Sequence, residues 1–163
     1  ADLVTFGVLP SLIYYKLLEG QFGFEVEYFA ILVALLSALR LAKFNIDEGQ
    51  SDSFIGLTTT ANGILASSVP LILAGSSLLS HTMINPYVVF STMLLPALLM
   101  VSPITLISLK FTDFSLRNNL EKWILIVLSL ASVAFFRESG IPIIILIYIL
   151  LSLVLNLNKK LKR

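Results

Sequence analysis

Cysteine is absent from this chain of 163 residues, and charged residues are scarce. Without cysteine, the chain cannot form disulfides, thiolate metal sites or a cysteine nucleophile. Only 13% of its residues are charged, whereas about a quarter are charged in an average soluble domain. The single histidine, His81, has no second histidine nearby and is expected to be solvated. No Walker loop, glycine fingerprint or Ser-His-Asp set is present, so the common soluble enzyme motifs are excluded.

Long apolar runs make up most of the sequence, with 57% hydrophobic residues and a mean hydropathy of +0.94. Six runs approach the roughly 20 residues that cross a hydrocarbon core, and the connections between them are short. We therefore expect an all-α polytopic transmembrane helix bundle. Its about six membrane helices are predicted at residues 2–18, 28–44, 54–79, 87–109, 123–136 and 141–157. The transmembrane domain would span residues 1–157, and residues 158–163 would form a basic cytoplasmic tail.

Basic residues favour one side of this predicted bundle. Counted over alternate connections, nine of the eleven fall on the side that holds residues 40–62, and the positive-inside rule places that side in the cytoplasm. The nine are Arg40, Lys43, Lys110, Arg117, Lys122, Lys159, Lys160, Lys162 and Arg163. The sequence therefore predicts an integral membrane protein in which the polar residues 40–62 face the cytoplasm.

Many of the polar residues lie within residues 40–62, which are predicted to form a hairpin between two membrane helices. Arg40 lies about one turn inside a helix end, where an unpaired charge costs a few kcal/mol. It is therefore either a snorkelling anchor or a ligand for a phosphate or carboxylate. Lys43 is closer to water and has the pattern of an anchor. Beyond it, Asp47, Glu48 and Asp52 form a solvated loop or, alternatively, a divalent-cation site.

Two further places carry polar side chains within apolar runs. Thr58, Thr60 and Asn62 recur at helical spacing and are expected to line one face of a helix, although membrane hydroxyls also bond their own backbone. Asp2 stands at the start of the first helix, where the helix dipole favours a carboxylate. It is either an ordinary interfacial cap or a functional group.

Three blocks of sequence resemble the phosphatidylserine synthase branch of the CDP-alcohol phosphotransferase family. They are Ala1-Asp-Leu-Val-Thr-Phe-Gly-Val-Leu-Pro10, Arg40-Leu-Ala-Lys-Phe-Asn45, and Ser53-Phe-Ile-Gly-Leu57 with Ala61-Asn62. The resemblance covers residues 1–65, and beyond them only hydropathy agrees. It implies transfer of a phosphatidyl group from CDP-diacylglycerol to L-serine with release of CMP.

The family's motif is D-x-x-D-G-x-x-A-R, eight residues, then G-x-x-x-D-x-x-x-D, and its last aspartate falls on Asp2. The other motif residues would precede Ala1, so we expect an N-terminally truncated chain that is inactive alone. The resemblance implies that Asp2 is the catalytic base and a ligand of a divalent metal, Mg²⁺ or Mn²⁺. Metal ions would neutralise charge on the phosphates, while the carboxylate activates the serine hydroxyl.

The resemblance also implies an acceptor or phosphate pocket. Arg40 and Asn45 match the family's R-L-A-R-F-N block, in which Lys43 replaces the more usual arginine. Thr58 and Asn62 complete the expected substrate-binding set. The guanidinium of Arg40 would suit a serine carboxylate through bidentate pairing. Threonines at 58 and 60 stand where the family commonly has prolines, which puts fine specificity in question.

Two alternatives remain at this stage: a family member that uses another acceptor alcohol, and a small membrane transporter subunit. For a transporter, Arg40 and the threonines would line a permeation path. The expected partners are CDP-diacylglycerol, L-serine and the lipid bilayer, with no nucleic acid, and a homodimer is compatible with the family. The expected location is the bacterial cytoplasmic membrane.

Overall fold

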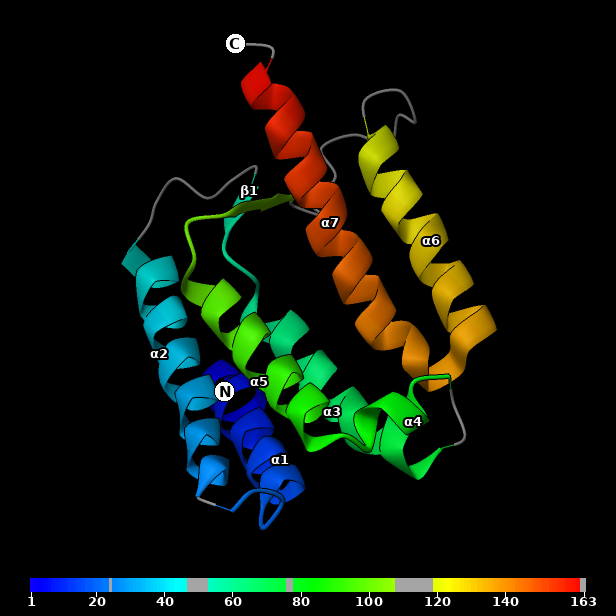
Figure 1. The fold of residues 1–163 in the computed structure, drawn as a ribbon. Helices are drawn as coiled ribbons and strands as arrows, with labels where there is room; N and C mark the ends of the chain where they lie inside the picture. Colours follow the sequence, from blue (N-terminus) through cyan, green and yellow to red (C-terminus); the bar gives the residue numbers. More distant parts are fainter. Residues whose placement is uncertain (24, 47–52, 76–77, 108–118, 162–163) are drawn as a thin grey trace.

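The computed structural model describes residues 1–23, 25–46, 53–75, 78–107 and 119–161. Six main helical segments run alternately in opposite directions along the bundle (Figure 1). In chain order the elements are η1 (Val4–Val8) with α1 (Leu9–Leu18), η2 (Val26–Ala30) with α2 (Ile31–Ile46), β1 (Ser53–Ile55), α3 (Thr59–Ala74), α4 (Ser80–Met83), α5 (Pro86–Val101), β2 (Thr105–Ile107), α6 (Leu120–Phe136), η3 (Arg137–Ser139) and α7 (Gly140–Leu161). The expected all-α class is confirmed.

Three expected helix boundaries are wrong. The third helix ends at Ala74, with Gly75 as its C-cap, rather than near residue 79. Gly and Pro explain the other two. The third helix begins at Thr59 rather than near residue 54, because Gly56 has a φ of 74°, which ends the preceding strand in a turn. The fourth helix ends at Val101 rather than near residue 109. Pro103 restricts the residue before it to extended conformations, and Ser102 accordingly has a ψ of 151°.

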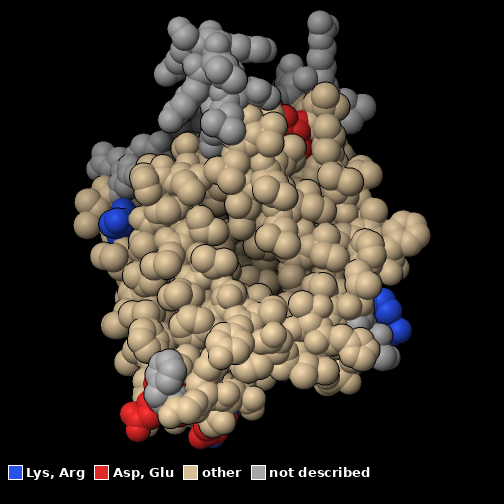
Figure 2. Space-filling view, in the orientation of Figure 1, with Lys and Arg blue, Asp and Glu red and all other residues tan. Residues whose placement is uncertain are grey.

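The apolar helices differ in length. By length and composition, two helical stretches could cross a membrane, Val26–Ile46 and Leu120–Leu155, and the second contains α6 and most of α7. Three shorter apolar helices accompany them in the described part of the chain: Val4–Leu18, Thr59–Ala74 and Pro86–Val101. Most of the face shown in Figure 2 carries no charged side chain, and the charges that are visible lie toward its margins. The six membrane crossings stay a prediction.

A small two-stranded ladder closes one end of the bundle. β1 and β2 pair antiparallel, with Ile55 opposite Thr105. After β1, Gly56 N–H donates to the Ile104 carbonyl at 2.8 Å, and Leu57 N–H donates to the Leu99 carbonyl at 3.0 Å. These bonds fasten the start of α3 against the end of α5.

Helix α7 holds the other strand of this ladder in place. The Tyr148 hydroxyl donates to the Ile107 carbonyl at 3.0 Å, and the Ile107 N–H donates to Ser152 Oγ at 3.2 Å. Both backbone groups of one β2 residue are thus bonded to α7 side chains. The C-terminal helices therefore help to position the ladder.

Two glycines bring three helices close together. A Cβ at Gly7 would lie 3.0 Å from Ser37 Cβ of α2, and a Cβ at Gly63 would lie 2.7 Å from Phe6 Cδ1. Side chains larger than hydrogen would force these helices apart. Below these contacts, Tyr14, Leu18 and other fully buried side chains form the core.

Candidate functional site

The close contact of Gly7 with Ser37 fixes which residues share one end of the bundle. α2 runs back along η1 and α1 (Figure 1), so moving backward from Gly7 and forward from Ser37 leads to the same end. At 1.5 Å per residue, Asp2 lies roughly 7 Å and Arg40 roughly 4 Å along that direction. Thr59 similarly lies roughly 6 Å before Gly63 on α3. The fold thus brings the helix ends that carry Asp2, Arg40 and Thr58 to one end of the bundle.

Arg40 is the buried charge at this end. The residue is only 6% exposed, and its Nε is buried without a hydrogen-bond partner. The Phe44 ring centroid lies 5.9 Å from the guanidinium carbon, a cation–π contact. Among the described residues, ion pairs join Lys16 to Glu19 and Arg137 to Glu138, and neither involves Arg40. A buried guanidinium is costly unless an anion pairs with it, and no carboxylate among the described residues does so.

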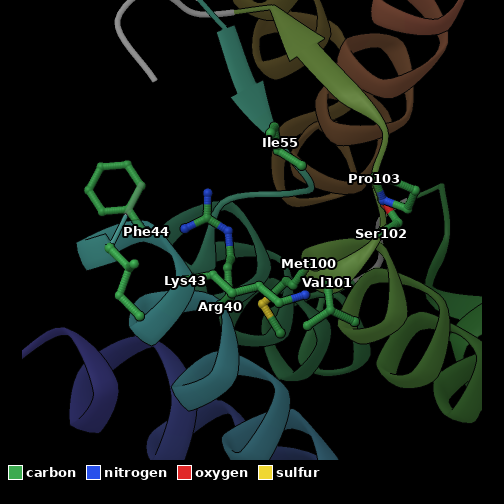
Figure 3. A pocket seen from close by; sticks show the side chains of 9 residues that line it. Arg40, Lys43, Phe44, Ile55, Met100, Val101, Ser102 and Pro103 are labelled. Carbon is green, nitrogen blue, oxygen red and sulfur yellow. The ribbon is translucent and has the colours of Figure 1, made fainter. Parts of the chain in front are cut away.

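Arg40 lines a pocket of about 500 Å³ between α2 and α5. Figure 3 shows Arg40, Lys43 and Phe44 of α2 on one side and the end of α5 on the other, with the guanidinium directed toward the β1 side. The lining residues are Arg40, Lys43, Phe44, Ile46, Ile55, Met100, Val101, Ser102 and Pro103. This α2–α5 pocket therefore presents two cations and no carboxylate from its described lining, an arrangement suited to a phosphate or carboxylate.

The other predicted substrate-binding residues do not line the α2–α5 pocket. Asn45 is exposed in the last turn of α2. Thr58 is the N-cap of α3, and its Oγ1 accepts a hydrogen bond from Ala61 N–H at 3.2 Å. The hydroxyl thus already serves the backbone, which was the alternative considered for it.

Asn62 is fully buried, and both polar atoms of its amide have no hydrogen-bond partner. Thr60, two residues earlier, is exposed. The expectation that Thr58, Thr60 and Asn62 share one helix face is therefore wrong, because residues two apart on a helix point in different directions. The unpaired amide of Asn62 is the second orphaned polar group near this end of the bundle.

Asp2 is exposed in the first helical turn. Among the described residues, no group of three or more His, Cys, Asp or Glu side chains could hold a metal ion. One carboxylate supplies far fewer ligands than the six oxygens that Mg²⁺ prefers. The described residues alone therefore do not fit a divalent-metal site. Asp47, Glu48 and Asp52 lie outside the described residues.

Several lining residues were missed by the sequence analysis. Ile55 and the end of α5, from Met100 to Pro103, reach the pocket because β1 folds over α5. Gly56 and Pro103 were the available signals, since each marks the end of an element. The position of Tyr148 next to β2 had no signal in the sequence, because it depends on the packing of α7.

These features define a helical, largely apolar protein with a pocket at one end of its bundle that is lined by Arg40 and Lys43. No protein-family model matches the chain. Comparison with curated proteins finds CDP-diacylglycerol–serine O-phosphatidyltransferases. The one from Helicobacter pylori strain J99 is 43% identical over 67 residues, which are 40% of this chain and 28% of that protein. The one from Bacillus subtilis strain 168 is 36% identical over 91 residues, which are 52% of this chain and 51% of that protein.

This chain is related to the phosphatidylserine synthases, as its sequence blocks predicted. The alignments span between about a quarter and about half of the length of these relatives.

Proposed function

We propose that the protein containing this chain transfers a phosphatidyl group from CDP-diacylglycerol to L-serine and releases CMP. The observation that carries this proposal is Arg40, a buried guanidinium with an unpaired Nε beside a pocket of about 500 Å³. The names of the related proteins supply the reaction, and the pocket supplies a place for its anions.

In the proposed reaction, the serine hydroxyl oxygen attacks the phosphorus that carries the diacylglycerol. The bond from that phosphorus to the bridging oxygen breaks, and CMP leaves with this oxygen. The serine proton passes to the Asp2 carboxylate, which acts as the general base. Asp2 is exposed at the same end of the bundle as Arg40, where a polar acceptor has access from water.

Arg40 and Lys43 would bind the anionic groups in the α2–α5 pocket. A planar guanidinium pairs with a carboxylate through two parallel hydrogen bonds, whereas an ammonium acts as a point charge. We therefore assign the serine carboxylate to Arg40, with Lys43 at the exposed rim as a second positive charge. Asn45, Thr58 and Asn62 stay proposed substrate contacts.

The protein would act in a membrane, with this end of the bundle facing the cytoplasm. Two helical stretches are long and apolar enough to cross a bilayer, and a lipid donor requires access from one. Dependence on a divalent metal, with Asp2 as one ligand, is part of the proposal, as is a homodimer. The metal requirement is tested by removing divalent ions with a chelator and restoring Mg²⁺ or Mn²⁺ separately.

The experiment measures CMP release from CDP-diacylglycerol by the full open reading frame, with divalent metal, with and without L-serine. An Asp2→Asn variant is compared with Glu27→Gln, which changes a carboxylate at the opposite end of the bundle. We expect serine-dependent release that is lost only in Asp2→Asn. Release that depends on another alcohol would support the same family of reaction but with that alcohol, and not serine, as the acceptor. The absence of release with every acceptor would overturn the reaction and favour the transporter alternative.

A further inference from the structure

A second large hollow lies on the other side of α3. It has a volume of about 540 Å³ and is formed by α3, α6 and α7, with β2 at one end. Nine of its twelve lining residues are apolar, and six of these are isoleucines. We call it the α3–α6–α7 groove. The described lining of this groove contains no charged residue, unlike that of the α2–α5 pocket.

The groove runs along the helices from a polar end to an apolar end. Thr58 and Tyr148 mark the polar end, and Ile64 and Ile141 mark the apolar end. Tyr148 lies seven positions after Ile141 on α7, which corresponds to about 10 Å along the axis. One leaflet of hydrocarbon is about 15 Å deep. The groove therefore covers about two thirds of the depth of a leaflet.

The polar atoms at the upper end already have partners. Thr58 Oγ1 accepts from Ala61 N–H, and the Tyr148 hydroxyl donates to the Ile107 carbonyl. The Thr58 hydroxyl can still donate and the Tyr148 hydroxyl can still accept, so these polar contacts with a ligand are confined to this end. Along the isoleucines of the groove, a polar ligand would lose its hydration without compensation, whereas a hydrocarbon chain has no such cost. The chemistry of the lining thus selects an apolar, elongated occupant.

One side of the groove lies at the exposed apolar surface, and its polar end lies near the candidate site. Leu130 lines the groove and is 68% exposed, while Leu146 and Leu150 of α7 are also exposed. A lipid chain could therefore enter the groove sideways past Leu130. At the other end, Thr58 lines the groove, and Ile55, three residues earlier in β1, lines the α2–α5 pocket.

We propose that the α3–α6–α7 groove binds one acyl chain of CDP-diacylglycerol. The inference rests on the proposed function and assigns a role to the last two helices. An acyl chain gains little hydrophobic free energy on leaving the bilayer, because lipid tails are as apolar as the groove. The groove instead orients the donor, with its diphosphate at the polar end. Binding and orientation lower the entropy cost of reaction.

Photocrosslinking tests occupancy directly. The full open reading frame is placed in phosphatidylcholine vesicles with a trace of CDP-diacylglycerol that carries a diazirine in one acyl chain. The control probe is phosphatidylcholine with the same diazirine chain. We expect labels at Ile145 and Ser129 to be at least threefold stronger with the CDP-diacylglycerol probe, and unlabelled CDP-diacylglycerol to compete. Equal labelling by both probes, or labelling of Leu146 alone, would overturn the proposal.

A pair of variants tests the consequence for turnover. Ile145 is 8% exposed and lines the groove, whereas Leu146, the next residue, is 59% exposed. We expect Ile145→Trp to raise KM for CDP-diacylglycerol at least tenfold, with KM for serine unchanged, and Leu146→Trp to change neither more than twofold. Equal KM values for the two variants would overturn the proposal that the groove binds an acyl chain.

The crosslinking and kinetic results separate the groove from the reaction. Selective labelling of the groove without CMP release would keep the donor site and overturn the proposed reaction. Serine-dependent release with unselective labelling would support the proposed reaction and overturn the proposal that the groove binds an acyl chain.

Discussion

Arg40→Met replaces a buried charge by an apolar side chain of similar length and should separate stability from function. The residue is 6% exposed, its Nε has no hydrogen-bond partner, and the described lining of its pocket contains no carboxylate. Replacing buried charges by well-packed apolar residues is often neutral or stabilises a protein by roughly 1–4 kcal/mol. We expect the variant to fold and to be at least as stable as the parent chain.

The same substitution should remove most of the activity. Truncating one partner of a buried, charge-assisted contact costs about 2–5 kcal/mol. At 1.36 kcal/mol per tenfold, kcat/KM should fall by roughly 30-fold to 5,000-fold. Arg40→Lys keeps the charge but loses the bidentate geometry, so its kcat/KM should lie between those of the parent and Arg40→Met.

The assay combines serine-dependent CMP release by the full open reading frame with thermal denaturation in detergent. Arg137→Met is the matched control, because that side chain is 82% exposed at the opposite end of the bundle. Activity within threefold of the parent value would refute the role of Arg40 as an anion ligand. A large drop in melting temperature would instead show that the buried charge stabilises the fold.

Three further substitutions test the surroundings of the site. Gly56→Ala should destabilise the protein by roughly 3 kcal/mol, because φ is 74° and the new Cβ would lie 2.3 Å from the Met100 carbonyl oxygen. Gly20→Ala, at a φ of 69° with open space around it, should cost only about 1 kcal/mol in the same denaturation assay. Thr58→Val should lower stability by about 1 kcal/mol through loss of the cap, whereas Thr58→Ser should retain it; equal losses would exclude capping. Asn62→Leu should raise stability by about 1 kcal/mol and lower kcat/KM at least tenfold, and full activity would exclude a substrate contact.

The helices could be predicted from the sequence, and so could the position of Arg40 inside an apolar helix. Long apolar runs specify helices, and a charged residue within such a run requires an explanation wherever the helix packs. The ends of the helices were harder to predict. Phe54 and Leu106 lie in short apolar segments that periodicity cannot distinguish from helix. Their pairing joins residues about fifty positions apart, which only the fold can bring together.

The environments of single side chains also depended on the true start of α3. With the helix begun near residue 54, Thr58 was expected on a helical face, but the turn at Gly56 makes Thr58 a cap instead. A threonine three residues before the apolar run is itself a capping signal. Tyr148 could not be connected to the ladder from sequence, because its bond to Ile107 requires α7 to fold back over β2.

Tight packing in the middle of the bundle accounts for the open end. Gly7 against Ser37 and Gly63 against Phe6 hold three helices close together about one turn from the end that carries Arg40. Contacts this close do not relax without moving whole helices, so the packing can retain a buried guanidinium whose Nε has no hydrogen-bond partner, at a cost in stability. On the other side of this end, α7 holds β2 in place through its two hydrogen bonds to Ile107, and β2 pairs with β1. The pocket is therefore formed before any ligand binds, and an anion entering it would remove a cost that the folded chain already carries.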